Sequence, residues 1–404
     1  MAFASGINKV VVVHKETVWG TAPAAGSTSA RYIPRVNLDL ALSRESFASD
    51  RINSHAQVGE SRSGTDVVSG TLSDEIATGS HTAVYECLLR GAFVNGVTST
   101  AITYSSSAVD NSLNDSGNGF LTAGYKIGDV VDITGFTAPA TANNGRAMIM
   151  SLTAGKMILS GVTLVTKAAG DSVTILVAGK KLGVPAEVAN RTDDSYTIEQ
   201  FYADIGVSRL ATGCKFGSAS FSLQPDAMGT VEFDVQAKDM KTAGTRYFTA
   251  PQAAYASSVM AGNKAFLMMD GAPAVLVTGL DFEVQGNLEA SSVVGNLQPD
   301  GTRPSAAIFQ GRIEVSGTVT AYFENDTLFD KFRDEEEITL AFWMKGDGGK
   351  DIVFKMGRVK LGSATPNDGS TGGLTQEISF NALYRENATG TAYDDSCIVI
   401  QEIA

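Results

Sequence analysis

The second half of this chain repeats the first, and this repeat limits the possible fold more than any other feature of the sequence. Three short stretches recur in the same order at nearly the same spacing. They are Leu38-Asp39-Leu40 with Leu280-Asp281-Phe282, Val68-Ser69-Gly70-Thr71 with Val315-Ser316-Gly317-Thr318, and Val84-Tyr85-Glu86 with Leu328-Phe329-Asp330. The offsets are 242 (280 − 38), 247 (315 − 68) and 244 (328 − 84), so the register drifts little. We therefore expect two copies of one structural unit.

Further along the chain the offset between matching stretches drops sharply. The matches are Tyr196-Thr197-Ile198 with Ile338-Thr339-Leu340, Lys215-Phe216-Gly217 with Lys355-Met356-Gly357, and Glu232-Phe233 with Glu377-Ile378. Their offsets are 142 (338 − 196), 140 (355 − 215) and 145 (377 − 232). The drop predicts an insertion of roughly one hundred residues into the first copy. The predicted parts are residues 1–95 and 190–248 for repeat 1, 96–189 for the insertion, and 249–404 for repeat 2.

The composition and the residue patterns of both copies indicate an all-β protein. Charged residues make up only 19% of the chain, and 42 glycines against 10 prolines favour many turns. Phe216, Phe221 and Leu223 stand beside serines 218, 220 and 222, which is the period-two pattern of a strand with one polar face. We predict two tandem β-sandwich or barrel units and, within the first, a small SH3-like β domain.

Each copy is also expected to contain one short helix. In the first, Ser80 is the predicted N-cap, and a buried face is formed by Val84, Cys87 and Leu88. In the second, the predicted N-cap is Asn325 or Asp326, and the expected buried face consists of Leu328, Phe329 and Phe332.

The insertion has its own strand and turn signals. Residues 147–150 and 156–159 are apolar and flank the turn residues Ala154 and Gly155, so they predict a hairpin. Because a domain inserted into another must begin and end at one place, residues 96–104 and 183–190 should lie close together.

Two long segments with little regular pattern occupy equivalent places in the copies, residues 46–63 and 287–305. Loops of this length within compact domains are usually functional or disordered. Their matching placement favours a reach to a neighbouring subunit, whereas the alternative is an ordinary mobile surface hairpin.

The formal net charge of −13 argues against tight nucleic-acid binding, which needs clustered Lys and Arg. It is compatible with a surface that DNA passes without adhering, and equally with simple solubility. The three cysteines, Cys87, Cys214 and Cys397, are scattered, which fits buried thiols in a reducing compartment. The first residues carry no basic region, and the apolar run from Val10 to Val13 is too short for a signal or a membrane span.

No set of residues predicts catalysis, a cofactor site or a metal site. The three histidines, His14, His55 and His81, have no metal-pair spacing, and no G-x-S-x-G elbow or P-loop occurs. The stretch 346–350 is predicted to be a hairpin turn. The acidic groups at 334–337 and 394–395 are expected to be solvated. Trp19 and Trp343 are expected to anchor a core or an interface. We therefore expect no enzyme.

Several stretches resemble the major tail (tail tube) proteins of siphophages. They are Lys15-Glu16-Thr17-Val18-Trp19-Gly20-Thr21, Tyr32-Ile33-Pro34, the repeated Val-Ser-Gly-Thr, and Gln376-Glu377-Ile378-Ser379-Phe380-Asn381-Ala382. The stretch 124–136 is similar to the accessory β domain of some members. The resemblance implies a structural virion protein whose sheets join edge to edge around a lumen.

It further implies trimeric, pseudo-hexameric rings that stack into a tube for DNA ejection. The long loops would bridge rings, and the inserted domain would lie outside. The implied partners are other copies of the chain, a tape-measure protein, and the tail terminator and distal tail proteins, with no membrane insertion. The implied location is the virion tail after synthesis in the host cytoplasm.

Proteins with other functions have a similar composition. A head decoration protein or a tail-end ring protein would differ in assembly behaviour, and a bacterial surface adhesin would bind cells or glycans.

Overall fold

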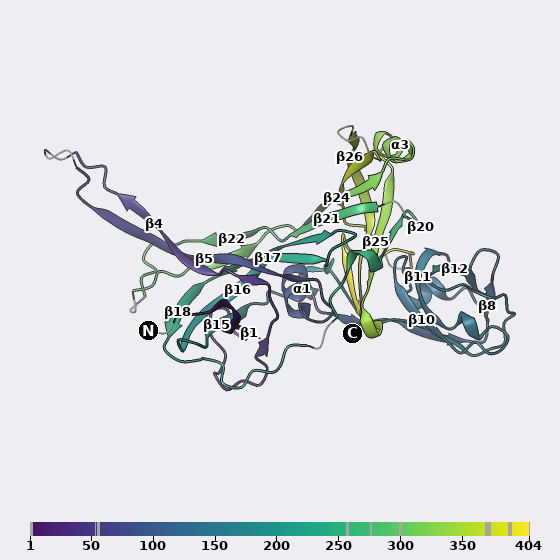
Figure 1. Cartoon of the computed structure of the whole chain (residues 1–404), viewed down its shortest axis with the longest axis horizontal. Coiled ribbons are helices and arrows are strands. Elements are labelled where there is room, and N and C mark those ends of the chain that lie inside the picture. Colours follow the sequence, from purple (N-terminus) through teal and green to yellow (C-terminus); the bar gives the residue numbers. More distant parts are fainter. Residues whose placement is uncertain are drawn as a thin grey trace.

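The computed structural model describes residues 3–52, 54, 57–255, 258–274, 277–298, 301–367, 373–386 and 390–403. These residues form mostly β-strands, which confirms the all-β prediction (Figure 1). The described part contains three short α-helices, namely α1 (Thr82–Leu89), α2 (Phe120–Ala123) and α3 (Thr327–Arg333).

A central antiparallel sheet runs through the whole body of the molecule. Its strands pair in the order β3 and β4, β5, β17, β16, β21, β24, β27, β26. Their bounds are β3 (Asn37–Leu38), β4 (Ala41–Ala48), β5 (Ser61–Glu75), β16 (Val207–Leu223), β17 (Thr230–Ala237), β21 (Val277–Gln285), β24 (Glu314–Tyr322), β26 (Asp351–Asn367) and β27 (Thr375–Ala382).

The two longest strands, β16 and β26, each leave the central sheet and continue into a flanking sheet. The first half of β16 pairs with β15 and β18, and β15 pairs in turn with β1 and then β2. The first half of β26 pairs with β25 and β28, followed by β19 and β20 on one side and by β14 and β6 on the other. The bounds are β1 (Lys9–Lys15), β2 (Arg31–Tyr32), β6 (Val94–Asn95), β14 (Lys180–Gly183), β15 (Tyr196–Tyr202), β18 (Asp239–Ala243), β19 (Ala265–Met269), β20 (Ala272–Pro273), β25 (Glu337–Lys345) and β28 (Val399–Ile403).

The strand pairings occur twice in the same arrangement. We call β1–β5, α1 and β15–β18 the first set, and β19–β28 with α3 the second set. Each pairing of the first set has a counterpart in the second: β1 with β15 corresponds to β19 with β25, and β16 with β18 corresponds to β26 with β28. Likewise, β5 with β17 corresponds to β24 with β27.

The hydrogen-bonded register corrects one of the sequence matches. Phe216 lies opposite Val235, and Leu361 lies opposite the corresponding Phe380. Lys215-Phe216-Gly217 therefore corresponds to Lys360-Leu361-Gly362 and not to Lys355-Met356-Gly357. The pattern Lys-x-Gly occurs twice within β26. Only the pairing with β27 shows which of these two tripeptides corresponds to Lys215-Phe216-Gly217.

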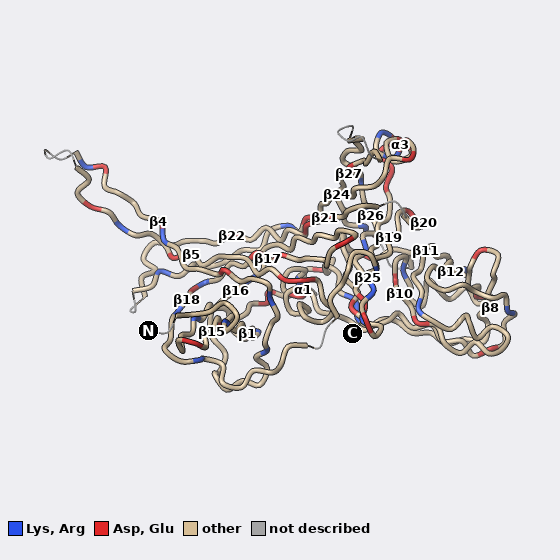
Figure 2. Tube along the Cα trace, viewed as in Figure 1, with Lys and Arg blue, Asp and Glu red and all other residues tan. Residues whose placement is uncertain are grey.

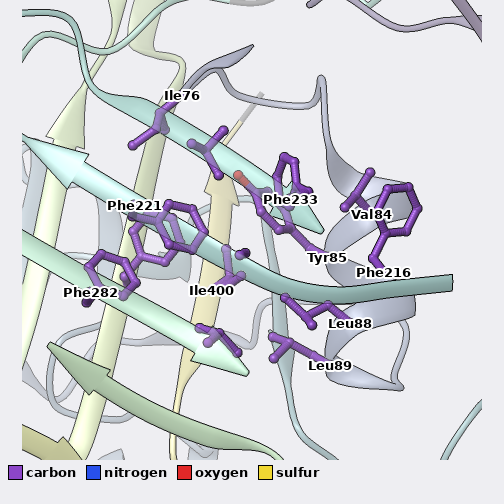
Figure 3. Close-up of a cluster of buried hydrophobic side chains, with 14 of the residues drawn as sticks. Ile76, Val84, Tyr85, Leu88, Leu89, Phe216, Phe221, Phe233, Phe282 and Ile400 are labelled. Atoms are coloured by element: carbon purple, nitrogen blue, oxygen red, sulfur yellow. The ribbon is translucent and has the colours of Figure 1, made fainter. Parts of the chain in front are cut away.

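One face of the central sheet packs into the main core. Phe221, Phe233 and Phe282 project from three different strands toward α1 (Figure 3). Tyr85 of α1 lies between them, with ring centroids 5.9 Å from Phe233 and 6.2 Å from Phe221. Ile400 from β28 reaches the same cluster, so the second set covers the helix of the first.

The two helices differ more than the sequence suggests. The expected face of α1 is buried, because Val84, Cys87 and Leu88 are each at most 2% exposed. Its N-cap residue is His81, and the prediction of Ser80 was wrong.

Helix α3 begins after Asp326, one of the two predicted caps, but its predicted burial was wrong. Phe329 is 43% exposed, and Leu328 and Phe332 are only half-buried. The helix lies at the outer end of β24 and β26, away from the centre of the molecule where α1 packs (Figure 1).

The inserted segment forms a separate seven-stranded sheet with its own core. Its order is β7-β13-β10-β11-β12-β9-β8. The bounds are β7 (Thr98–Ala101), β8 (Tyr104–Ser107), β9 (Ser112–Asp115), β10 (Val130–Thr134), β11 (Gly145–Leu152), β12 (Lys156–Ser160) and β13 (Val173–Val177). The pairing of β11 with β12 confirms the predicted hairpin. The chain enters and leaves this sheet side by side, since Gly96 N donates to Gly179 O at 3.1 Å.

A buried ion cluster connects this sheet to the body. Asp129 accepts hydrogen bonds from both Lys181 and Lys355, and Asp394 forms ion pairs with the same two lysines. Burial alone would raise the pKa of Asp394, but the two ammonium groups lower it below its usual range. The prediction that Asp394 is solvated was therefore wrong. Trp343 packs at the same seam, and its Nε1 donates to Asp351 Oδ2 at 3.1 Å.

Candidate functional site: an acidic sheet face and two open edges

The face of the central sheet opposite the core is polar along its whole width. On β17 and β16, exposed Glu232 and Ser220 alternate with buried Phe233 and Phe221. Part of this face forms a shallow hollow, with residues from five neighbouring strands in its lining. The alternation is the one that the sequence predicted from residues 216 to 223.

Carboxylates and hydroxyls alternate across the strands of this face. Directly opposite positions form the row Ser73, Glu232, Ser220, Glu283, Ser316, Asn381. The hydroxyl of Ser73 donates to Glu232 Oε2 at 3.0 Å. Because directly opposite like charges destabilise a sheet, this spacing lets the face hold many acids without strain on the pairing.

The polar positions of this face carry seven acids and two lysines. Lys215 lies opposite Gln236 and is buried, and Lys360 lies opposite Asn381 and forms an ion pair with Glu335. The positions are 69, 71, 73 and 75 on β5, 215, 218, 220 and 222 on β16, 230, 232, 234 and 236 on β17, 281, 283 and 285 on β21, 314, 316, 318 and 320 on β24, 360, 363, 365 and 367 on β26, and 375, 377, 379 and 381 on β27. The acids among them are Glu75, Glu232, Asp234, Asp281, Glu283, Glu314 and Glu377. Figure 2 shows acidic positions along the strands of this sheet. A polyanion would be repelled by such a surface.

The central sheet ends in two edges without a partner strand in the described part of the chain. One edge is the second half of β26, which pairs with β27 on its other side. The other edge is β3 with β4, which pair with β5. Open edges present unpaired N–H and C=O groups, so they are templates for pairing with another chain.

Two hairpins project from the end of the molecule opposite the inserted sheet (Figure 1). The first is β4 with β5, and the second is β22 (Leu288–Ser291) with β23 (Ala307–Gln310). The predicted segments 46–63 and 287–305 lie in them. The hairpins touch, since Asp66 N donates to Arg303 O at 2.9 Å and Arg303 N donates to Asp66 Oδ2 at 2.7 Å.

Large apolar side chains are exposed on both hairpins. On the first they are Phe47 (59% exposed), Ile52 (101%) and Val58 (68%), and on the second Val293 (53%), Val294 (105%) and Leu297 (60%). Several large apolar side chains exposed on two hairpins that contact each other favour a surface that another molecule covers.

The residues considered for chemistry lie apart from each other. His14 contacts Ser27, His81 is buried beside Asp74, and His55 lies outside the described residues. Across the described part of the chain, no group of three or more His, Cys, Asp or Glu could hold a metal ion. None of the described helices has the length and apolar character needed to cross a bilayer.

The remaining candidates have structural surroundings. All three cysteines are free, and burial raises the pKa of Cys87 to about 12. Residues 346–350 form the predicted turn between β25 and β26. Acids 334–336 are exposed, as expected, and Glu335 and Glu336 form ion pairs with Lys360 and Lys331.

Comparison with protein families identifies the chain. The model of the phage tail tube protein family matches residues 6–382. The chain belongs to the phage tail tube protein family. It is therefore a structural protein of a phage tail tube, which places it in the virion tail and indicates that it assembles with itself. No curated protein matches the chain.

Sequence reasoning found the family but not the residues of this surface. It left open which acids share a face, because the strand order of the central sheet brings together positions that are far apart in sequence.

Proposed function

We propose that three copies of this tail tube protein close into a ring and that rings stack into the conduit for phage DNA. Each copy would supply two tail-tube units in tandem, residues 1–95 with 190–248 and residues 249–404, with 96–189 inserted into the first. The observation that carries the proposal is the repeated strand arrangement, which ends in two open edges.

The pairing of β16 with β21 inside the chain predicts how the open edges of two copies would pair. Within the chain, the second half of β16 pairs with β21, and Ser220 lies opposite Glu283. By the strand correspondence, Ser220 is equivalent to Thr365, and Glu283 is equivalent to Ala41. Thr365 of one copy should therefore lie opposite Ala41 of the next copy. Pairing both edges removes the exposed edge strands.

The size of such a ring suits a DNA channel. The central sheet has eight strand positions, since β3 and β4 share one, and three copies give 24 (three times eight). At roughly 4.8 Å between strands the circumference is roughly 115 Å, and strand tilt widens the barrel further. That circumference corresponds to a diameter of at least about 37 Å, so the lumen is wide enough for a DNA duplex.

The polar face would line the lumen of the tube and set its charge. The core occupies the other face, so closing the sheet with the polar face inward leaves the inserted domain and α1 outside. The seven acids of this face outnumber its two lysines, and both lysines form ion pairs with acids. The face would therefore repel phosphate, and DNA would slide through without binding.

The two hairpins would bridge successive rings. They project together from one end of the molecule and carry apolar groups that contact with an adjacent ring would bury. Further partners would be a tape-measure protein, a tail terminator and a distal tail protein, and assembly would begin in the host cytoplasm. The siphophage type of tail is part of the same proposal.

Negative-stain electron microscopy of the purified chain, together with its mass in solution, tests this proposal. We expect trimers and hollow tubes with a ring repeat. A closed ring that never stacks would favour a tail-end ring protein. Binding to capsids would favour a decoration protein, and binding to cells or glycans would favour an adhesin.

Cysteine cross-linking tests the register of the junction. The double variant Ala41→Cys with Thr365→Cys should form disulfides between chains. The matched control, Ser43→Cys with Thr365→Cys, is displaced by two residues and should cross-link much less. Cys87 and Cys214 are buried, and burial raises the pKa of the half-buried Cys397, so background reaction should be low. Equal cross-linking of both pairs would contradict the register.

A further inference from the structure

The end of the first set of strands is closed by a segment from elsewhere in the chain. Residues Val259 and Ala261 form isolated β-bridges with Ala77 and Met228, which follow β5 and precede β17. Between them, Met260 N donates to Ile76 O at 2.9 Å, and Met260 O accepts from Gly229 N at 2.8 Å. Met260 is fully buried. This short segment therefore acts as a cap on the ends of β5 and β17.

The corresponding end of the second set lacks such a cap within the described chain. Phe323 N donates to Leu374 O at 2.9 Å, as Ile76 N donates to Gly229 O at 2.7 Å in the first set. Leu374 is 39% exposed on the core side of β27, whereas Tyr322, which is 50% exposed, lies opposite Thr375 on the polar face. Phe329 of α3 is 43% exposed. In the described chain, this end of the second set therefore leaves Leu374 and Phe329 without the cover that Met260 gives the first set.

The segment that leads into β1 has the same local structure as the cap. A 3-10 turn, Gly262–Lys264, directly precedes β19, and a 3-10 turn, Gly6–Asn8, directly precedes β1. Strands β1 and β19 occupy corresponding places, since Val13 lies opposite Ile198 and Met269 lies opposite Leu340. The offset is 256 for the strands (269 − 13) and also for the turns (262 − 6). Phe3, Ala4 and Ser5 therefore correspond to Val259, Met260 and Ala261.

Two observations indicate that the segment from Phe3 to Asn8 is covered by another molecule. Phe3 is 85% exposed and Ile7 is 89% exposed, although both are apolar. Gly262 lies so close to Gln224 that an added Cβ would stand 2.0 Å from its carbonyl oxygen, which explains the glycine. At Gly6 an added Cβ would meet nothing within 4 Å in its own chain.

We propose that the segment from Phe3 to Asn8 of one copy caps the open ends of β24 and β27 of the neighbouring copy in the ring. The inference deepens the proposed tube function and rests on it. The cap inside the chain fixes the expected pairs: Phe3 lies opposite Glu324, and Ser5 lies opposite Gly373. Phe3 and Ala4 thereby cover the surface at Phe323 and Leu374, so ring closure joins copies through this segment as well as through the sheet edge.

Cross-linking of the full-length chain tests the placement. Ser5→Cys with Gly373→Cys should yield a disulfide between chains in trimers, whereas the control Ile7→Cys with Gly373→Cys should react at least about tenfold less. A disulfide within one chain, or one that appears only in stacked tubes, would overturn the proposal.

Matched glycine variants separate assembly from folding. Gly262→Val should lower the melting temperature of the chain itself. Gly6→Val should leave the melting temperature of the monomer unchanged but raise the concentration needed for trimers by about tenfold or more. If the Gly6→Val chain assembles normally, and the Ala41→Cys and Thr365→Cys positions still cross-link in it, the proposed capping segment is overturned and the proposed ring is not. A wild-type chain that stays monomeric at every concentration would overturn both the segment and the proposed tube.

Discussion

The central sheet contains one closed junction, β16 with β21, and two open edges formed by the corresponding strands, β26 and β3 with β4. The side chains at the closed junction and at the open edges differ. At the closed junction, Phe221 of β16 stacks on Phe282 of β21, with ring centroids 4.5 Å apart and ring planes at 12°. By the strand correspondence, the same positions at the open edges hold Pro366 and Leu40. The closed junction therefore adds an aromatic stack to its backbone pairing. At the open edges Leu40 is already buried in its own copy and Pro366 is exposed, so these edges offer mainly backbone pairing.

This difference indicates when each junction forms. Burial of the phenylalanines is part of folding, so the two sets of strands are fixed to each other in every copy (Figure 3). Pairing of the open edges requires a second copy, so it depends on protein concentration. One chain thus contains both a permanent and an assembly-dependent version of one junction.

Removing an aromatic ring from the closed junction should give the largest effect. We expect Phe282→Ala to lower the free energy of unfolding by about 3–5 kcal/mol, because a ring is lost from a packed core. Leu42→Ala at the open edge, where Leu42 is 40% exposed, should change it far less in the monomer. Urea unfolding of both variants measures the contrast, and equal losses would show that the junctions do not differ in this way.

Arg90 also holds the closed junction together. It follows α1 and donates to Gly311 O at 2.6 Å and to Gly286 O at 2.8 Å, both beside strands of the second set. Arg90→Met keeps the apolar stem but leaves these carbonyls without their donor, which should cost about 1–3 kcal/mol. Thermal unfolding checks this, with Arg312→Met, an exposed arginine, as control. A loss no greater than that of the control would exclude a role at the junction.

The contact of Glu402 with α1 joins the second set of strands to the first and should make the stability of the chain sensitive to pH. Glu402 of β28 accepts from Thr82 Oγ1 at 2.7 Å, and burial raises its pKa to about 7. A carboxyl whose pKa is higher in the folded state stabilises the fold below its unfolded pKa and loses this contribution as pH rises through 7.

The wild type should therefore lose stability relative to Glu402→Gln between about pH 4.5 and 8. Unfolding of both proteins across this range measures the difference. Parallel pH profiles would contradict the assignment to Glu402.

The polar face should be nearly neutral for folding and important only in the assembled tube. Glu283→Lys should change the free energy of unfolding by no more than about 0.5 kcal/mol, because the face is solvated. In tubes it should cause retention of DNA that weakens as salt increases. Retention is measured by sedimentation of tubes with DNA, and Glu289→Lys, outside the polar face, is the control. Absence of retention would mean that this face does not line the channel.

The sequence allowed the prediction of features that rest on local pattern. Alternation of Ser220 and Phe221 predicts which side chains share a face of a strand, because successive residues of a strand point to opposite sides. The buried face of α1 and the β11–β12 hairpin follow from similar short-range rules. The repeated Val-Ser-Gly-Thr stretch lies at corresponding places of β5 and β24.

The failed predictions concern neighbours that lie far away in sequence. Residues 355–357 and 360–362 of β26 have the same pattern, and hydrogen bonds to β27 decide between them. Asp394 looks like a surface acid until Lys181 and Lys355 are brought to it from two other strands.

By itself, the sequence determined the all-β class and the family, because these depend on residue type and spacing along the chain. Only the tertiary structure decided the register of β26, the exposure of α3 and the acids that share the polar face. Those properties depend on the order of strands in the sheet and on which surfaces the rest of the chain covers. Burial and pairing are collective, so no single stretch of residues encodes them.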